Sequence, residues 1–300
     1  MSNWAIGIIS GLVAGLMQSC SYLGGQRFLN KYNNSAQMVI CSLLITGAVT
    51  WLMAPFFLYT STLFSWRMLL YVIMTDIGLV VGHWGFFSAQ KHIESSRIAS
   101  LMGLKVLVVA VLSIVLLRIG FTFLQYLAML GAASAGLLMN WNQGKLNWNG
   151  MGYMLVCFIG YAFSDLGVQL VVQEMPAEDP IAAGFSGFIV NYSVTGLGAL
   201  CLIKKFKIDY RMLCTALPQG LCWVVSMWGL YICFGLVGAA FGNVLQASRG
   251  IISLVIGIIL SYFAMQSLEK KQSADQWVRK AVAALIMFGS IMLYAFTAKG

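Results

Sequence analysis

The sequence predicts an all-α integral membrane protein with ten transmembrane helices, built as two inverted five-helix repeats. Three observations lead to this prediction. The chain has 300 residues, of which 60% are hydrophobic and 9% charged, and its mean hydropathy is +0.85. Its apolar runs are each close to the ~20 residues that a helix needs to cross a bilayer. Short sequence matches also recur at one constant spacing along the chain.

Charged or Asn/Gly/Pro-rich stretches divide the chain into ten apolar segments. Helices are expected for all of them, because a backbone surrounded by lipid must satisfy its own hydrogen bonds. The first segment begins at Trp4 with no basic residue before it, which favours a mature helix over a cleaved signal. The expected segments are residues 3–24, 36–58, 67–90, 96–117, 121–141, 151–172, 181–203, 212–234, 238–263 and 278–298.

The two halves of the chain, 1–143 and 147–300, align with each other. Trp84-Gly85 recurs as Trp228-Gly229 at an offset of 144, and Leu23-Gly24-Gly25-Gln26 resembles Leu166-Gly167-Val168-Gln169 at an offset of 143. We call this offset, 143 or 144, the repeat spacing. With five helices in each half, the second half enters the membrane from the opposite side, so the repeat is inverted. No connection is long enough to fold alone, and the halves together form one membrane domain.

The basic residues are distributed unevenly between the two sides of the membrane. Thirteen lie on the side of the first connection and only three on the other. The positive-inside rule then places both termini outside. The thirteen are Arg27, Lys31, Lys91, Arg97, Lys145, Lys204, Lys205, Lys207, Arg211, Lys270, Lys271, Arg279 and Lys280, and the three are Arg67, Arg118 and Lys299.

Five ionisable residues lie well within the predicted spans, away from their ends, and two of them, Lys105 and Arg249, are cations at the repeat spacing. A charge in hydrocarbon costs roughly 2.5–3.5 kcal/mol on insertion scales, so it marks a candidate site. The others are Asp76, His83 and Asp165. One alternative is purely structural, with salt bridges from Asp76 to Lys105 and from Asp165 to Arg249. Against it, buried ion pairs seldom add net stability over apolar replacements.

Asp76 and His83 stand two helical turns apart, with Trp84 beside them, and either could carry a proton in coupled transport. For His83 the alternative is a hydrogen-bonded core histidine. Polar and aromatic side chains at similar depth complete the expected substrate site. They are Gln18, Tyr22, Asn191, Asn243, Gln246 and Trp228, with Tyr161, Trp223 and Tyr231 as further aromatic candidates.

One pattern occurs twice in the sequence. It consists of a short polar stretch, a long aliphatic helix and a final helix that contains glycine. The first copy runs from Ser95-Ser96-Arg97 through Lys105 to Leu117 and on to Gly131, and the second from Gly235 through Arg249 to Leu260 and on to Gly289. This pattern resembles the drug/metabolite transporter superfamily, in particular its EamA-like ten-helix members. The resemblance implies a central cavity between the two inverted repeats, lined by the first, third, fourth, sixth, eighth and ninth helices.

This chain departs from that family in two respects. Many members carry a proline near the positions of Lys105 and Arg249, and none is present here. Members of this size also keep both termini in the cytoplasm, whereas the charge distribution places them outside.

The expected function is that of a secondary active transporter working by alternating access. Paired cations favour an anionic group on the substrate, and the carboxylates could receive an amine. A zwitterionic metabolite, such as an amino acid or a derivative with a planar ring, satisfies both. A proton-coupled transporter or exchanger of an organic anion is the close alternative. An enzyme acting on lipid-linked substrates and a passive assembly protein are remote ones.

The remaining expectations concern partners and location. No Walker A motif is present, and the seven cysteines show no ligand spacing, so neither a cofactor nor a metal is expected. The basic residues form no stripe for a nucleic acid. A monomer is expected, since two repeats can already enclose a cavity. We expect a multi-pass protein surrounded by lipid, in a bacterial inner membrane.

Overall fold

The computed structural model describes residues 2–58, 65–93, 95–140, 150–175, 179–252, 255 and 274–297. All regular structure in these ranges is helical, as predicted. The elements are α1 (Asn3–Tyr32), α2 (Ser35–Phe57), α3 (Trp66–Ala89), α4 (Ser95–Leu101), the 3₁₀ turn η1 (Met102–Leu104), α5 (Lys105–Leu117), α6 (Phe123–Asn140), α7 (Met151–Glu174), α8 (Pro180–Phe206), α9 (Tyr210–Ala247) and α11 (Ala274–Thr297).

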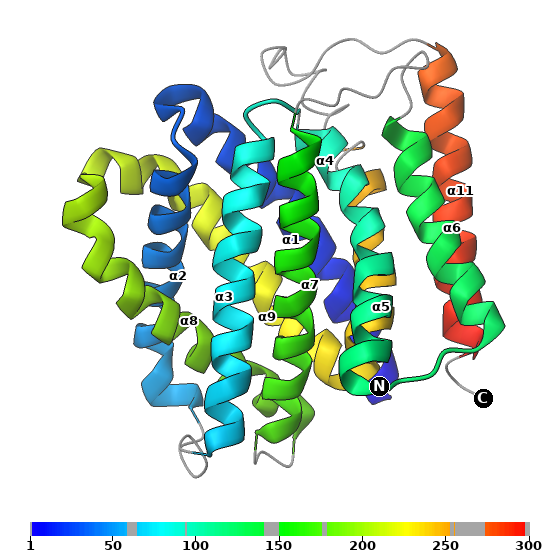
Figure 1. Cartoon of the computed structure of the whole chain (residues 1–300), viewed down its shortest axis with the longest axis horizontal. Coiled ribbons are helices and arrows are strands. Elements are labelled where there is room, and N and C mark those ends of the chain that lie inside the picture. Colours follow the sequence, from blue (N-terminus) through cyan, green and yellow to red (C-terminus); the bar gives the residue numbers. More distant parts are fainter. Residues whose placement is uncertain are drawn as a thin grey trace.

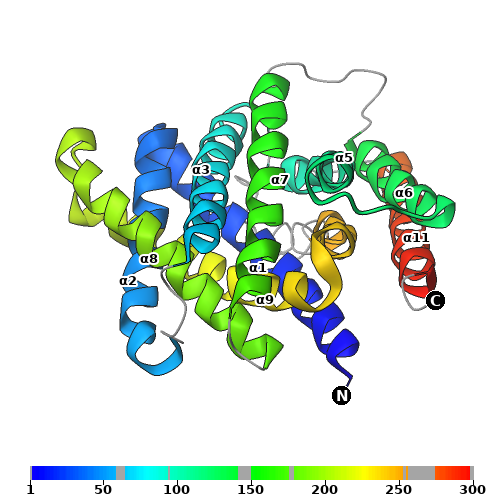
Figure 2. The ribbon, with the colours of Figure 1, turned by 60° about the horizontal axis from the view of Figure 1, so that its bottom comes forward.

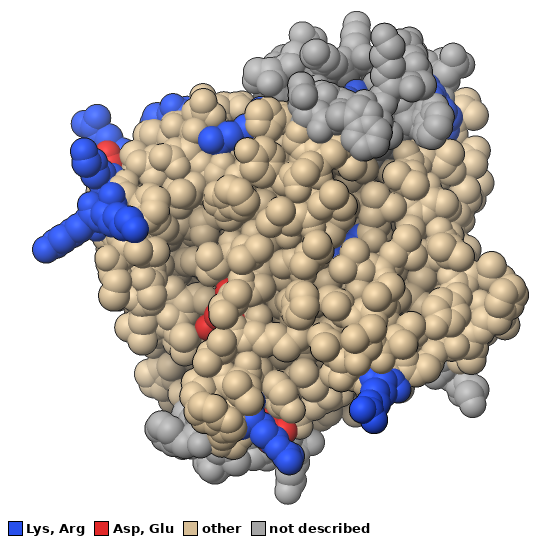
Figure 3. Space-filling view, viewed as in Figure 1, with Lys and Arg blue, Asp and Glu red and all other residues tan. Residues whose placement is uncertain are grey.

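Helices long and apolar enough to cross a membrane make up most of the described chain. There are seven of them by length and composition, and two further apolar helices, Phe123–Leu138 and Ala281–Thr297, are shorter. Figure 3 shows most of the visible Lys and Arg side chains at two opposite ends of the molecule, with few charged side chains in the band between them. These features are those of an integral, multi-pass membrane protein.

The helices form a bundle with α1, α3, α7 and α9 at its centre (Figures 1 and 2). α1 packs along α9, and α3 along α7. α2 and α8 pair on one flank, while α6 and α11 pair on the other. α5 packs against α7 and α9, so α7 lies between α3 and α5. This order of helices decides which of the predicted charges can meet.

α1 is longer than the apolar run that predicted it, which ended at residue 24. Polar residues extend the helix to Tyr32, and Gln26 Nε2 donates to Asn30 Oδ1 at 3.0 Å on its exposed face. Asn33 then takes the left-handed conformation, with φ of 48°, and ends the helix. Gln26, in these added turns, reaches the start of α4, where its Oε1 accepts a hydrogen bond from Ser95 Oγ.

Helix α9 contains the predicted segment 212–234 and the first part of the next predicted segment, 238–263. At Gly238 the backbone takes φ of 80°, outside the helical region, and the chain changes direction (Figure 2). Gly238 is the first residue of the predicted segment 238–263, whose end lies outside the described residues. Glycine suits this position because an L side chain at that φ would strain the backbone.

Candidate substrate-binding site

Each of the two cations follows an interruption in its helix. The segment predicted over 96–117 is broken by the 3₁₀ turn Met102–Leu104, and α5 begins at Lys105. Likewise, α9 ends at Ala247, Ser248 forms a turn, and the helix resumes at Arg249. A break inside a membrane helix exposes backbone groups and the positive end of the following helix, features that transporters use to bind anions.

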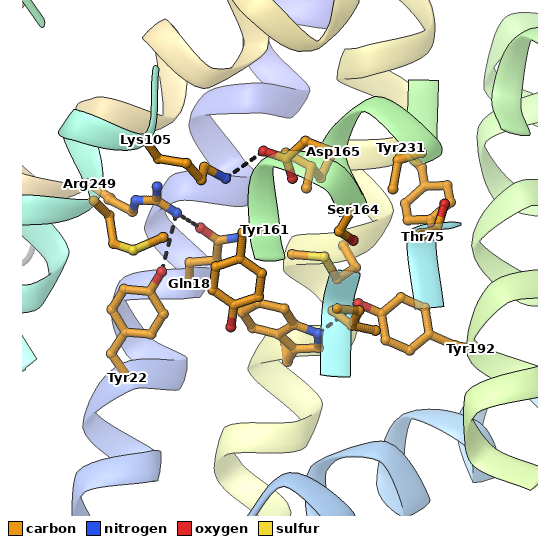
Figure 4. A pocket seen from close by; sticks show the side chains of 16 residues that line it. Gln18, Tyr22, Thr75, Lys105, Tyr161, Ser164, Asp165, Tyr192, Tyr231 and Arg249 are labelled. Carbon is orange, nitrogen blue, oxygen red and sulfur yellow. Dashed lines mark hydrogen bonds and ion pairs between the residues drawn. The ribbon is translucent and has the colours of Figure 1, made fainter. Parts of the chain in front are cut away.

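Lys105 forms an ion pair with Asp165 of α7. The Nζ atom lies 2.5 Å from Oδ2 of Asp165, and the two side chains are only 3% and 6% exposed. Asn243 Nδ2 donates to the same oxygen at 2.8 Å. The ring centroid of Tyr161 lies 5.6 Å from the Lys105 ammonium, within cation–π range. Oδ2 of Asp165 therefore has two protein partners, and Figure 4 shows the contact with Lys105.

This pairing corrects the alternative in which Asp76 would pair with Lys105 and Asp165 with Arg249. Asp76 belongs to α3, and α7 separates α3 from α5. α7 instead presents its own carboxylate directly to Lys105. Both carboxylate oxygens of Asp76 are buried and have no hydrogen-bond partner among the described residues.

Arg249 is 1% exposed and its guanidinium contacts neutral groups. One terminal nitrogen, Nη1, donates to the side-chain oxygen of Gln18, to the Tyr22 hydroxyl at 3.2 Å and to Gln246 Oε1 at 3.2 Å. Its Nε has no partner in the described part of the chain. Among those residues no carboxylate lies within ion-pairing distance of Arg249. The three ionisable groups Lys105, Asp165 and Arg249 thus sum to a formal charge of +1.

The two cation sites occupy corresponding positions in the halves of the chain. Lys105 and Arg249 stand at the repeat spacing, and so do their partners Tyr22 and Asp165. The shared framework thus has a carboxylate in one site and a phenol in the other. In the described part of the chain, the charge of Lys105 is neutralised and that of Arg249 is not.

Aromatic and small polar side chains complete the cavity beside these charges (Figure 4). Trp223 Nε1 donates to the Tyr192 hydroxyl at 2.8 Å, and the Tyr231 hydroxyl has no described partner. The lining residues are Gln18, Tyr22, Thr75, Leu79, Met102, Lys105, Tyr161, Ser164, Asp165, Val168, Tyr192, Trp223, Met227, Leu230, Tyr231 and Arg249. Sequence reasoning missed Thr75 and Ser164 as lining residues, although each directly precedes one of the two aspartates that it singled out.

His83 lies behind the cavity wall. The Tyr161 hydroxyl is 3.1 Å from its Nδ1, and the Trp223 ring meets it edge-on with centroids 4.6 Å apart. The histidine is fully buried, and its Nε2 has no hydrogen-bond partner among described residues. Because Tyr161 and Trp223 both line the cavity, His83 can position them without touching a substrate.

The other predicted site residues divide into supporting and distant groups. Asn243 and Gln246 hold Asp165 and Arg249 in place, although neither lines the cavity. Trp84 is 44% exposed and packs edge-on against Tyr153, away from the cavity. Trp228 packs against Phe185 and Phe188, and Asn191 is buried; neither lines the cavity.

Comparison with known proteins adds evidence for the fold alone. No protein-family profile and no curated protein sequence matches this chain. One solved structure, described as "Crystal structure of protein", superposes with a TM-score of 0.69 at 13% sequence identity. The superposition covers 98% of this chain and 97% of that one, so the same arrangement of helices spans both molecules.

Proposed function

We propose that this protein is a secondary transporter that moves a small metabolite with an anionic group by alternating access. The observation that carries the proposal is Arg249, an arginine buried at 1% exposure whose partners among the described residues are all neutral. Burying a charge without a counter-charge is costly in free energy, so we expect a ligand that neutralises Arg249. The anionic group of a substrate would do so.

Close helix crossings support two equivalent halves. α7 meets α3 at Gly167, where an added Cβ would lie 3.0 Å from the backbone nitrogen of Thr75. α1 meets α9 at Gly24, where an added Cβ would lie 2.9 Å from the nitrogen of Gln219. Gly24 and Gly167 stand at the repeat spacing, and so do Thr75 and Gln219. Matched crossings therefore join the two halves to each other at two places.

A second pair of contacts at the same spacing strengthens this argument. A Cβ on Gly85 would lie 2.8 Å from the carbonyl oxygen of Tyr153, and one on Gly229 would lie 2.6 Å from that of Ser10. The two glycines stand at the repeat spacing, and so do the residues that carry the two carbonyls. We take residues 1–143 and 147–300 as inverted five-helix repeats.

The length of the α9 region supports ten crossings in all. The apolar span Tyr210–Ile252 has 43 residues. As a straight helix it would reach about 65 Å, roughly twice the thickness of the hydrocarbon. The bend at Gly238 divides it into two passes, and the two shorter apolar helices bring the number of passes to ten. This arrangement is similar to that of the EamA-like transporters that the sequence resembles.

Two matched glutamines offer a means of alternating access. Gln169 Oε1 accepts from the backbone nitrogen of Ala239 at 2.8 Å, directly after the bend at Gly238. Gln26 Oε1 accepts from Ser95 Oγ at 3.2 Å, at the start of α4. The repeat spacing relates the two glutamines to each other, and it also relates their partners.

These two contacts hold opposite ends of the bundle. In Figure 1, α4 lies near the upper end, whereas the N-terminus of α1 lies at the lower end. The bend belongs to that lower end, because Gly7 of α1 approaches Val237. Both contacts are formed and the lining residues are buried, as expected for an occluded state. Releasing one contact at a time would open the cavity alternately to each side.

The substrate is best described as zwitterionic, an amino acid or a related metabolite with a planar ring. Arg249 would take its anionic group, and the rings of Tyr22, Tyr161 and Trp223 would stack against the planar part. An amine would require a carboxylate such as that of Asp76, which does not itself line the cavity but directly follows Thr75, which does. An organic anion moved in exchange for a proton is the second candidate, and the net +1 charge of the site favours it. In either case we place both termini outside, following the basic residues.

Uptake by proteoliposomes tests the proposal. A thermal-shift screen of the purified protein against amino acids, nucleoside derivatives and organic anions would first provide a substrate. Arg249→Gln should abolish its uptake, while Arg211→Gln, at an exposed site on α9, should leave uptake unchanged. Equal uptake by wild type and Arg249→Gln would contradict the proposed role.

A further inference from the structure

We propose that Tyr22 and Asp165 set the number of anionic groups that a substrate may carry, and that this number is one. The inference rests on the proposed function and specifies its substrate class. Asp165 supplies one of the two cations with an internal carboxylate, 2.5 Å from Lys105. Tyr22, at the corresponding position beside Arg249, supplies only a hydroxyl at 3.2 Å.

The correspondence extends to a second pair of residues. Gln18 accepts a hydrogen bond from Arg249, and Tyr161 places its ring 5.6 Å from the Lys105 ammonium. Gln18 and Tyr161 are separated by the same repeat spacing that relates Tyr22 to Asp165. Two homologous side chains therefore contact each cation. The difference in charge between the two sites comes from one position, a carboxylate in α7 and a phenol in α1.

This difference has a direct electrostatic consequence for the ligand. One anionic group at Arg249 brings the formal charge of Lys105, Asp165 and Arg249 to zero. A second anionic group would find Lys105 already paired and would leave a net negative charge in a low-dielectric cavity. The cavity therefore discriminates against dianions, and Asp165 occupies the place that a second anionic group would take.

Succinate and succinamate provide a matched pair of probes, because they differ by one negative charge at nearly constant size. Binding to the full-length protein in detergent is measured at constant ionic strength. Wild type should bind succinamate more tightly than succinate by about tenfold or more. Asp165→Asn frees the Lys105 ammonium, and the preference should reverse toward succinate. An unchanged ratio of the two dissociation constants in Asp165→Asn would overturn the inference.

A second variant keeps the test informative if Asp165→Asn does not fold. Tyr22→Asp places a carboxylate beside Arg249 and should weaken succinamate binding by about tenfold or more. Tyr22→Phe removes the hydroxyl without adding charge and should bind succinamate more tightly than Tyr22→Asp does. Unaltered succinamate binding by Tyr22→Asp would contradict the charge rule while leaving an anion site in place. Failure of every form to bind either probe would instead contradict the anion site itself, and with it the proposed function.

Discussion

Arg249 donates a hydrogen bond to the hydroxyl of Tyr22, whose counterpart at the repeat spacing is Asp165, the partner of Lys105. Among the described residues, a carboxylate neutralises Lys105, whereas Arg249 contacts neutral groups. With a carboxylate beside one cation and a phenol beside the other, Lys105, Asp165 and Arg249 carry a formal charge of +1 together. The proposed preference for a substrate with one anionic group follows from that difference.

Asp165→Asn should destabilise the protein strongly. It would leave the Lys105 ammonium buried at 3% exposure without its carboxylate, a loss of about 3–5 kcal/mol for a broken buried pair. Unfolding in detergent, followed by circular dichroism, measures the change.

Asp76→Asn provides the matched comparison, since its carboxylate has no hydrogen-bond partner in the described chain. Removing that charge should leave the unfolding midpoint unchanged or raise it. A loss of stability equal to that of Asp165→Asn would show that Asp76 has a partner that this account lacks.

Gln169→Leu should loosen the bend at Gly238. The Ala239 amide would lose its acceptor at 2.8 Å, and an unsatisfied buried donor costs about 1–3 kcal/mol. Hydrogen exchange measured by mass spectrometry should therefore be faster in peptides that contain Ala239.

Gln26→Leu is the control for the opposite end of the bundle. It removes the contact with Ser95 and should leave exchange near Ala239 as in wild type. If both variants accelerated exchange equally at Ala239, the two glutamines would not act on separate ends.

Gly160→Ala should force α3 and α7 apart. The added Cβ would lie 2.5 Å from the backbone nitrogen of Gly82, and a backbone contact cannot be relieved by a change of rotamer. Overpacking of this kind costs about 1–3 kcal/mol. Gly152→Ala, in the same helix, meets nothing within 4 Å and should be neutral or slightly stabilising. Equal melting temperatures for the two variants would rule out close packing at Gly160.

Local patterns in the sequence predicted much of the helical structure. Apolar runs located the spans because lipid demands long, self-satisfied segments, and α2 and α3 begin and end within one residue of the prediction. The extension of α1 to Tyr32 was not predicted, because the last turns of the helix are polar. The 3₁₀ turn before Lys105 was also not predicted, since Met102–Leu104 continues an apolar run without a proline or a polar residue.

The site could be predicted only in part. Depth and charge singled out Lys105, Arg249 and Asp165, which the cavity brings together with Gln18 and Tyr22. Which carboxylate meets which cation depends on how helices pack, and a single sequence does not encode that in a local pattern. The exposure of Trp84 was not predicted for the same reason, because it also depends on how the helices pack. Its neighbours Gly82 and Gly85 form the face against α7, and Trp84 lies on another side of the helix.

The central claim is that Arg249 neutralises the anionic group of the transported substrate, and uptake by proteoliposomes tests it most directly. Uptake of the substrate identified by thermal shift should be lost in Arg249→Gln and kept in Arg211→Gln, with both variants folded by circular dichroism. Wild-type uptake by folded Arg249→Gln would contradict the claim.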